Sequence, residues 1–246
     1  MLTSKMSDLL THAQSLVNDL ASLEFPAPVA VTYNPLTYAW ENHAQYLERY
    51  GAGRKDVLFL GMNPGPWGMS QTGVPFGEIS AVRDWMQLDG TIRKPDVEHP
   101  KRPVEGYDCP RTEVSGQRLW GYIRECFPLA EAFFSSHFVL NYCPLVWMSE
   151  TGANITPDKL SKATMAPIEE ACMRHLQEVI TVQRPAYLIG VGAYAEKRLL
   201  QAQRELGATD VTVAKILHPS PASPAANRGW AEAASKQLTE IGISWS

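Results

Sequence analysis

Closely spaced cysteines are absent from this chain of 246 residues. Structural zinc and iron–sulfur sites usually contain at least one C-x-x-C pair, because a single turn can then present two thiolates to the same metal. We therefore expect no metal site, and we interpret the cysteines as free, mostly buried thiols of a protein in a reducing compartment. They are Cys109, Cys126, Cys143 and Cys172.

An excess of basic residues is absent as well: 22 Lys and Arg residues face 26 Asp and Glu residues, for a net charge of −4. This balance argues against a polybasic mode of nucleic-acid binding, so any phosphate contacts must be few and well placed. No apolar run approaches the ~18 residues of a membrane span, and the first residues lack the features of a secretory signal. We expect an intracellular protein with no membrane partner, cytoplasmic if its source is bacterial.

Several short motifs of common enzyme classes are missing. The chain has no G-x-S-x-G elbow, no phosphate-binding P-loop and no H-E-x-x-H motif, which removes the commonest hydrolase and nucleotide-binding interpretations. Gly190-Val191-Gly192 resembles half of a dinucleotide-binding fingerprint, although a close strand-to-helix turn explains it better. A nucleotide-binding Rossmann-like protein is an alternative that rests on these glycines alone.

Four short apolar runs predict buried strands, and helical patterns separate them. Strands that alternate with helices favour a mostly parallel sheet with helices on both faces. The predicted strands are Val57–Gly61, Phe138–Asn141, Tyr187–Val191 and Val211–Leu217. The predicted helices between and after them are Ile79–Leu88, Gln117–Phe127, Ala166–Val182, Ala193–Leu206 and Trp230–Ile241.

The N-terminal part of the chain predicts two further helices. Apolar residues from Met6 to Leu20 recur at three- and four-residue steps, which is typical of an amphipathic helix packed on the core. Asn34 and Pro35 predict the cap and the first position of the second helix. Because no repeat, low-complexity tract or long linker divides the chain, we expect residues 1–246 to form one domain, with an N-terminal helix within residues 1–28 packed on it.

Candidate chemistry follows the predicted strands, because ligands of parallel sheets bind beyond the carboxyl ends of the strands. Glycine and proline alternate from Gly61 to Gly68, which fixes a sharp backbone and holds Asn63 rigidly. A tight structural turn is the alternative, but the density of proline and glycine after a buried strand favours a binding site. Phe76, in the continuing loop, either plugs the core or offers a platform on which a base stacks.

Two further polar residues stand at strand ends. The amide of Asn141 has one acceptor and two donors and can match the edge of a nucleobase, although a strand-end cap is the simpler interpretation. His218 follows the last predicted strand and precedes a stiff loop with three prolines. A lone histidine is more often structural, but its position at a third strand end makes His218 a candidate catalytic residue.

Together these segments resemble the single-strand-selective monofunctional branch of the uracil-DNA glycosylase superfamily. The resemblance covers most of the chain, from Tyr33 to about Gly242. It implies a three-layer α/β/α sandwich with a central four-stranded parallel sheet, and neither metal nor organic cofactor. Its most specific segments are GMNPGPWGMSQTGVPFGE from Gly61, EHPKRPV from Glu98, FVLNYCPL from Phe138 and HPSPASPAANRGW from His218.

The resemblance also implies the roles of the site residues. Asn63 would position the attacking water, and His218 would stabilise the departing uracil. Gly65 would leave room beside C5 of the base, which admits oxidised uracils such as 5-hydroxymethyluracil. The residues implied in base recognition are Asn141, Phe76, Met62 and Gly65.

The chemistry of the reaction agrees with these roles. Hydrolysis of an N-glycosidic bond develops negative charge on the uracil, so a donor aimed at O2 lowers the barrier. Asn63 is a poor base, so the mechanism must be dissociative, unlike that of sugar glycosidases with two carboxylates. No lysine lies between Lys55 and Lys94, so the first motif offers no nucleophile for lyase chemistry.

We expect the enzyme to flip the base out of single- or double-stranded DNA and to leave an abasic site. The loop after His218 is the predicted wedge and DNA contact, with serines and backbone amides to hold phosphates. It comprises Pro219, Ser220, Pro221, Ala222, Ser223 and Pro224. Animal members of the family carry arginine and asparagine in place of Ala222 and Ser223, so we expect weak duplex penetration and a bacterial source.

Two alternatives remain within and beside this family. One is a glycosylase of the same superfamily that acts mainly on deaminated purines, hypoxanthine or xanthine. The other is a non-catalytic DNA-binding homologue that kept the scaffold, against which the presence of Asn63 and His218 argues. In every case we expect a monomer whose partner is DNA.

Overall fold

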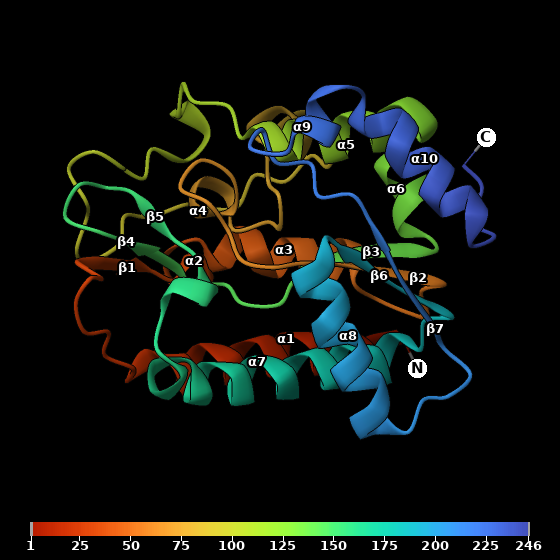
Figure 1. Ribbon diagram of the computed structural model, residues 1–246, viewed down its shortest axis with the longest axis horizontal. Helices are drawn as coiled ribbons and strands as arrows, with labels where there is room; N and C mark the ends of the chain where they lie inside the picture. Colours follow the sequence, from red (N-terminus) through yellow and green to blue (C-terminus); the bar gives the residue numbers. More distant parts are fainter. Residues whose placement is uncertain (1, 246) are drawn as a thin grey trace.

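Four parallel strands form the centre of the molecule, in the order β3-β2-β6-β7 (Figure 1). The computed structural model describes residues 2–245, and the side chains of residues 8–245. Every residue of β2 and β3 is buried, as expected for parallel strands covered on both faces. The predicted four-stranded parallel sheet is therefore confirmed. Its strands are β2 (Val57–Gly61), β3 (His137–Asn141), β6 (Tyr187–Val191) and β7 (Thr212–Ile216).

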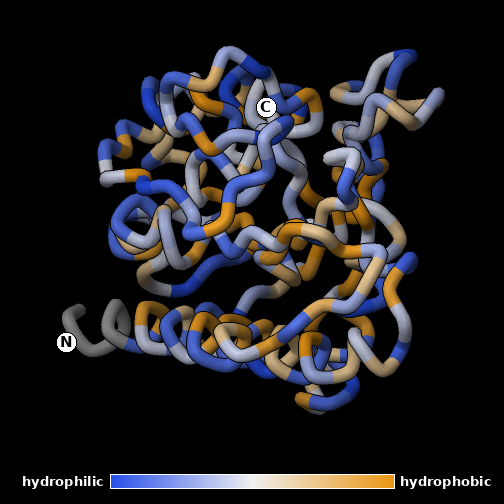
Figure 2. The backbone as a smooth tube through the Cα atoms, turned by 90° about the vertical axis from the view of Figure 1, so that its left-hand side faces the viewer, coloured by the Kyte–Doolittle hydropathy of each residue, from blue (hydrophilic) through white to orange (hydrophobic). Residues whose placement is uncertain are grey.

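Helices cover both faces of this sheet and complete three layers. In Figure 1, α1, α7 and α8 lie on one side of the sheet, and α5, α6 and α10 lie on the other. Viewed from the side in Figure 2, the lower helices form a separate layer along which hydrophobic and hydrophilic residues alternate. The longer helices are α1 (Leu2–Ala21), α3 (Trp40–Tyr50), α5 (Val114–Cys126), α7 (Lys162–Gln183), α8 (Ala193–Leu206) and α10 (Trp230–Glu240).

Helix α1 is the amphipathic helix predicted near the start of the chain. Its residues Leu9, Ala13, Leu16 and Leu20 are buried, and the helix packs against α7 and α3. The side chain of Met6, which the prediction included in this face, lies outside the described side chains. No helix in the described part of the chain has the length and apolar content needed to cross a membrane.

Asn34 and Pro35 begin a helix as predicted. The Asn34 side chain accepts a hydrogen bond of 3.1 Å from the Leu36 N–H group, and Pro35 occupies the first turn. The helix is interrupted at Ala39, so that α2 and α3 follow each other. The short helices are α2 (Pro35–Tyr38), α4 (Met69–Thr72), α6 (Ala130–Phe134) and α9 (Pro224–Asn227).

The helix predicted over Ile79–Leu88 begins at the predicted residue, but it ends early and is mostly of a different type. A π-helical turn covers Ala81–Trp85, in which the Met86 N–H group donates to the Ala81 carbonyl at 2.9 Å. Gln87 then adopts a φ of 52°, a left-handed conformation that stops the helix.

A second sheet was not predicted from the sequence. It is antiparallel, in the order β1-β4-β5, and its strands span only two or three residues, too few to show an alternating pattern. Its position matters because β5 leads directly to the candidate site. The strands are β1 (Val31–Tyr33), β4 (Val146–Met148) and β5 (Asn154–Ile155).

The glycines around β6 form a close strand-to-helix turn, as predicted. Gly192 has a φ of 95°, and a Cβ atom at Gly190 would lie 2.4 Å from the backbone nitrogen of Glu196 in α8. Only glycine allows this turn and this close packing. The segment is therefore explained by the fold, without a dinucleotide.

Candidate active site at the carboxyl ends of the strands

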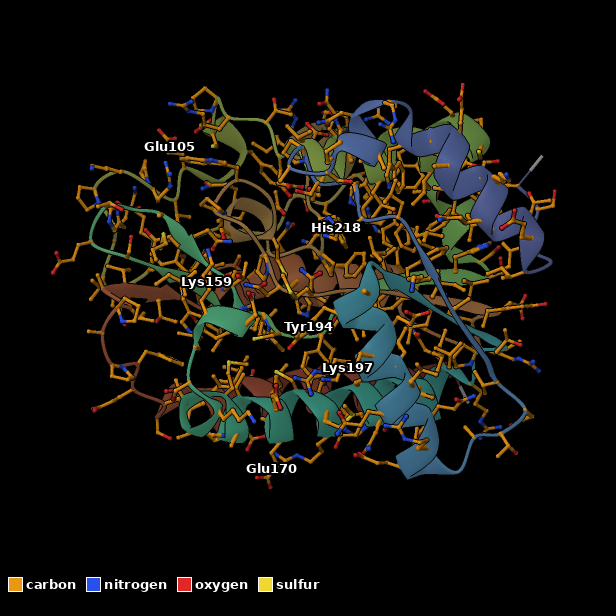
Figure 3. All side chains as sticks on the ribbon, viewed as in Figure 1. Glu105, Lys159, Glu170, Tyr194, Lys197 and His218 are labelled. Carbon is orange, nitrogen blue, oxygen red and sulfur yellow. The ribbon has the colours of Figure 1, made fainter. Side chains whose placement is uncertain are left out.

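The ends of β2, β3 and β7 meet at one cavity of about 290 Å³. The loop after β2 provides Asn63 and Phe76, β3 provides Asn141, and the residues after β7 provide His218. In Figure 3, His218 lies in the middle of the molecule, above the central sheet, whereas Glu105 and Glu170 lie at its periphery. These residues come from three segments that are far apart in the sequence, and two further segments complete the cavity.

Half of the other predicted site residues also line this cavity. They are Met62, Gly65, Ser220 and Pro221. Four residues of the predicted wedge loop do not line it: Pro219, Ala222, Ser223 and Pro224. The loop therefore contributes Ser220 and Pro221 to the cavity, whereas Ala222 and Pro224 are exposed on the surface.

The hydrogen bonds of Asn63 determine which end of its amide is available. Its Nδ2 donates to the carbonyl of Leu145 at 3.2 Å and, at 3.4 Å, to that of Pro64. Since the NH₂ group is engaged by the backbone, the Oδ1 atom is left as an acceptor. Asn63 therefore offers the cavity an oxygen that can orient a water molecule.

The hydrogen bond of His218 determines its tautomer. The Ser220 N–H group donates to Nδ1 of His218 at 3.1 Å, so Nδ1 carries no proton. Burial lowers the pKa of His218, because a low dielectric disfavours the charged imidazolium. The ring is therefore neutral near pH 7 with its proton on Nε2, and it can donate a hydrogen bond without being charged.

Phe76 is held in a conformation that few non-glycine residues adopt. Its φ is 54°, and such a backbone costs about 1–3 kcal/mol unless its surroundings enforce it. A Cβ atom at Gly61 would lie 2.6 Å from the Phe76 ring, and one at Gly116 would lie 2.0 Å from the Phe76 carbonyl oxygen. The absence of side chains at these two glycines lets Phe76 lie close against them, and Phe76 both packs in the core and lines the cavity.

Asn141 has its polar group available within the site. Its side chain is 7% exposed, and its only hydrogen bond among the described residues runs from Nδ2 to the sulfur of Met69 at 3.3 Å. Sulfur is a weak acceptor, so a ligand with a stronger acceptor can replace it. This arrangement differs from the strand-end cap considered from the sequence, in which the amide would bond the backbone.

Glu113 is a cavity residue that the sequence did not reveal. Its carboxylate accepts hydrogen bonds from the Ser115 and Gly116 N–H groups and caps α5. Burial raises its pKa. Since both carboxylate oxygens accept from N–H groups of the first turn of α5, we interpret Glu113 as the N-cap of this helix. Glutamate is not a favoured N-cap residue, so the capping pattern gave little signal.

Asn154 and Thr156 also line the cavity and were also missed. Asn154 begins β5, a strand too short to predict, and Thr156 follows its end. The Oδ1 atom of Asn154 is buried and has no hydrogen-bond donor among the described residues. An unpaired buried acceptor is unfavourable in an empty site, so this side of the cavity suits a ligand or water that donates a hydrogen bond.

Two arginines flank the cavity on a shared aromatic ring. The guanidinium carbons of Arg102 and Arg111 lie 5.1 and 5.7 Å from the ring centre of Trp67. Trp67 lies between Pro66 and Gly68 in the loop after β2, and Gly68 lines the cavity. Neither arginine forms an ion pair with any of residues 8–245. Two cations without a carboxylate partner therefore lie near the ring of Trp67, whose neighbour Gly68 lines the cavity.

The four cysteines are all free thiols, and three of them (Cys109, Cys143 and Cys172) are buried, as expected from their spacing. Across the described residues, no group of three or more His, Cys, Asp or Glu side chains is placed to hold a metal ion.

Comparison with known proteins identifies similar chains. Residues 48–239 match the model of the Uracil DNA glycosylase superfamily. The chain is 47% identical over 225 residues to the single-strand selective monofunctional uracil-DNA glycosylase of Rattus norvegicus, a match that covers 92% of this chain and 81% of the relative. It is 47% identical over 228 residues to the protein of the same name from Bos taurus, covering 93% and 84% of the two chains.

A solved structure has a similar fold. The crystal structure of wild-type Pedobacter heparinus SMUG2 matches with a TM-score of 0.63, covering 94% of this chain and 96% of that chain. At 18% sequence identity this similarity concerns the fold alone.

Proposed function

Because this chain belongs to the uracil DNA glycosylase superfamily, we propose that it removes uracil from DNA by hydrolysing the N-glycosidic bond. The relatives that it matches are named monofunctional uracil-DNA glycosylases, and it is an enzyme of that kind, acting in base excision repair. One observation carries the proposal: an acceptor on Asn63 and a donor on His218 belong to the same cavity. The scissile bond of a flipped nucleotide would lie between the oxygen of Asn63 and the imidazole of His218.

His218 stabilises the leaving group in this mechanism. As the glycosidic bond breaks, negative charge spreads onto the O2 atom of the uracil. The neutral imidazole, with its proton on Nε2, donates a hydrogen bond to that oxygen. A donor that is fixed before the reaction needs no reorganisation when the charge develops.

Asn63 orients the attacking water. Its Oδ1 accepts a hydrogen bond from the water while backbone carbonyls hold its NH₂ group. An amide oxygen cannot deprotonate water, so the bond to the departing base breaks ahead of the attack. This dissociative order fits a site whose carboxylate, Glu113, is partly buried and engaged in capping a helix.

The cavity is large enough for one flipped base. Its volume of about 290 Å³ exceeds that of a pyrimidine and of a purine alike, so we propose that hydrogen bonding and stacking, rather than size, select the base. A Cβ atom at Gly65 would meet no atom within 4 Å, so the cavity has open space there. We propose that this space accommodates a small 5-substituent, so that 5-hydroxymethyluracil is also a substrate.

The DNA strand would be held by few contacts, as the net charge of −4 requires. Arg102 and Arg111 supply positive charge beside the cavity, where phosphates can neutralise it. In the wedge loop, the N–H groups of Ser220, Ala222 and Ser223 are all engaged within the loop. The serine hydroxyl protons, rather than these amides, are therefore available to phosphate oxygens.

We propose activity on both single- and double-stranded DNA, with a preference for single strands. A base in a single strand needs no unpairing, which otherwise costs a few kcal/mol. The small side chains of Ala222 and Ser223 fill little of the space that a flipped base leaves in a duplex.

The test is a base-release assay on single-stranded and duplex oligonucleotides that carry uracil, 5-hydroxymethyluracil, hypoxanthine or xanthine, followed by alkali to cleave abasic sites. We expect release of uracil and of 5-hydroxymethyluracil, fastest from single strands. Release of purines alone would support the alternative of a purine-specific glycosylase. Tight binding to uracil-containing DNA without base release would mean a non-catalytic homologue.

A further inference from the structure

We propose that Arg118 of α5 is a positioning residue, which holds the loop after His218 so that the imidazole keeps the tautomer needed for donation. This inference rests on the proposed function. Arg118 does not line the cavity described above, and it acts through the backbone of the loop.

Within itself the loop satisfies only the carbonyl group of Ser220, which accepts from the Ser223 N–H group. Pro219, Pro221 and Pro224 have no N–H group. The other three residues of the loop have N–H groups, and all three are engaged. That of Ser220 donates to Nδ1 of His218, and that of Ala222 donates to the hydroxyl oxygen of Ser220. That of Ser223 donates to the carbonyl oxygen of Ser220. Donors for the other carbonyls must come from outside the loop.

Arg118 supplies those donors. Its Nη1 donates to the carbonyl of Pro219 at 3.0 Å and to that of Ser220 at 3.3 Å. Its Nη2 donates to Oδ1 of Asn227 at 2.8 Å, and Nδ2 of Asn227 in turn donates to the carbonyl of Pro221 at 2.9 Å. One guanidinium group thus holds three consecutive carbonyls, two directly and one through Asn227.

The connection to His218 passes through a single rigid peptide unit. The carbonyl of Pro219, which Arg118 holds, and the N–H group of Ser220, which donates to His218 Nδ1, belong to the same planar peptide. Fixing the carbonyl therefore fixes the direction of the N–H group. Without Arg118 this peptide can rotate, Nδ1 loses its donor, and the proton is free to occupy either ring nitrogen.

Arginine suits this role better than lysine. Its planar fork presents several N–H groups in fixed directions, whereas an ammonium group is a compact point charge on a flexible stem. Arg118 forms no ion pair with any of residues 8–245. Its hydrogen-bonding capacity is directed to the loop.

The matched control lies on the same helix. Arg124 is also partly buried on α5, and its Nη1 donates to the Ser80 hydroxyl at 3.1 Å, away from the loop. Arg118→Ala and Arg124→Ala therefore remove the same group from the same helix, and only the first releases the loop. Thermal unfolding of both variants identifies any general loss of stability.

The experiment measures uracil release in single turnovers at saturating single-stranded DNA. We expect Arg118→Ala to lower the rate about 10- to 100-fold, as the loss of hydrogen bonds to a charged donor implies, and Arg124→Ala to leave it near the wild-type rate. Arg118→Lys should restore part of the loss. Free guanidinium ion, at millimolar concentration, should partly rescue Arg118→Ala and should not rescue His218→Ala.

A spectroscopic measurement separates positioning from a merely structural role. In ¹⁵N spectra of the imidazole nitrogens, assigned with His218→Gln, the wild-type protein should show a protonated Nε2 and an unprotonated Nδ1. Arg118→Ala should show a mixture of tautomers. Provided that the wild-type protein releases uracil, two results would overturn the proposal. One is that Arg118→Ala and Arg124→Ala release uracil at the same rate. The other is that Arg118→Ala releases it more slowly while its His218 keeps the wild-type tautomer. A wild-type protein that releases no uracil would instead contradict the proposed function.

Discussion

The imidazole of His218 lies 6.3 Å from the ring of Phe76, centre to centre, with 47° between their planes. Phe76 belongs to the loop after β2 and His218 follows β7, and β6 lies between these two strands in the sheet. An aromatic face and a hydrogen-bond donor are thus brought together from separate strand ends. We expect a planar base that stacks on Phe76 to come within hydrogen-bond reach of Nε2 of His218.

Base selection should depend on Asn141. The Asn141→Asp substitution replaces an amide that can both donate and accept with a carboxylate that, when ionised, only accepts. Uracil presents an acceptor at O4 and a donor at N3, whereas cytosine presents the opposite pattern. We expect discrimination between uracil and cytosine to fall, as measured by release of each base from otherwise identical oligonucleotides. An unchanged ratio of the two rates would contradict the role of Asn141 in reading the base edge.

The sequence predicted the central sheet and the main site residues for clear physical reasons. β2 and β6 begin and end at the predicted residues because a continuous apolar run is the pattern of a strand buried on both faces. Asn63, Asn141 and His218 could be brought together because the carboxyl ends of parallel strands share one edge. A local pattern and a general topological rule were sufficient for these features.

The remaining features depend on contacts that no local pattern encodes. β5 has two residues, so neither the second sheet nor the cavity residue Asn154 was predictable. Arg118 and Pro219 are 101 positions apart in the sequence, and their hydrogen bond exists only once α5 has packed beside the loop. The tautomer of His218 likewise depends on the conformation of the peptide that follows it.

Substrate range should depend on Gly65. A methyl group at this position meets no protein atom within 4 Å, so Gly65→Ala should fold normally and occupy space that a 5-substituent needs. We expect release of 5-hydroxymethyluracil to fall about tenfold while release of uracil changes about twofold or less. Gly121→Ala is the control, because its Cβ atom also meets open space and it lies outside the cavity. Equal losses with both bases would show that Gly65 does not select the 5-substituent.

Stability should fall in mild acid because two buried histidines are held neutral. Burial lowers the pKa of His43 to about 4 and that of His175 to about 3, against about 6.5 in the unfolded chain. The unfolded chain therefore binds more protons below pH 6.5, so the stability contributed above that pH is lost as the pH falls toward 4. The loss is on the order of 3 kcal/mol for each histidine between pH 6.5 and pH 4.

Urea unfolding at pH 7 and at pH 5 measures this effect. The His43→Gln variant keeps a side chain that can donate to the Gly73 carbonyl, as Nδ1 of His43 does at 2.8 Å, but it cannot titrate. We expect its free energy of unfolding to change less between the two pH values than that of the wild-type protein. The same pH dependence in both proteins would mean that His43 is not the source.

The most direct test of the central claim is single-turnover release of uracil from a saturating single-stranded oligonucleotide by the wild-type, Asn63→Ala and His218→Ala proteins. The central claim is that the oxygen of Asn63 and the Nε2–H group of His218 act on one flipped nucleotide. We expect rapid release by the wild-type protein and a loss of about 10²- to 10³-fold for His218→Ala, the effect of removing one donor to a developing anion. Asn63→Ala should show a comparably strong loss. Near-normal release by either folded variant would contradict the claim.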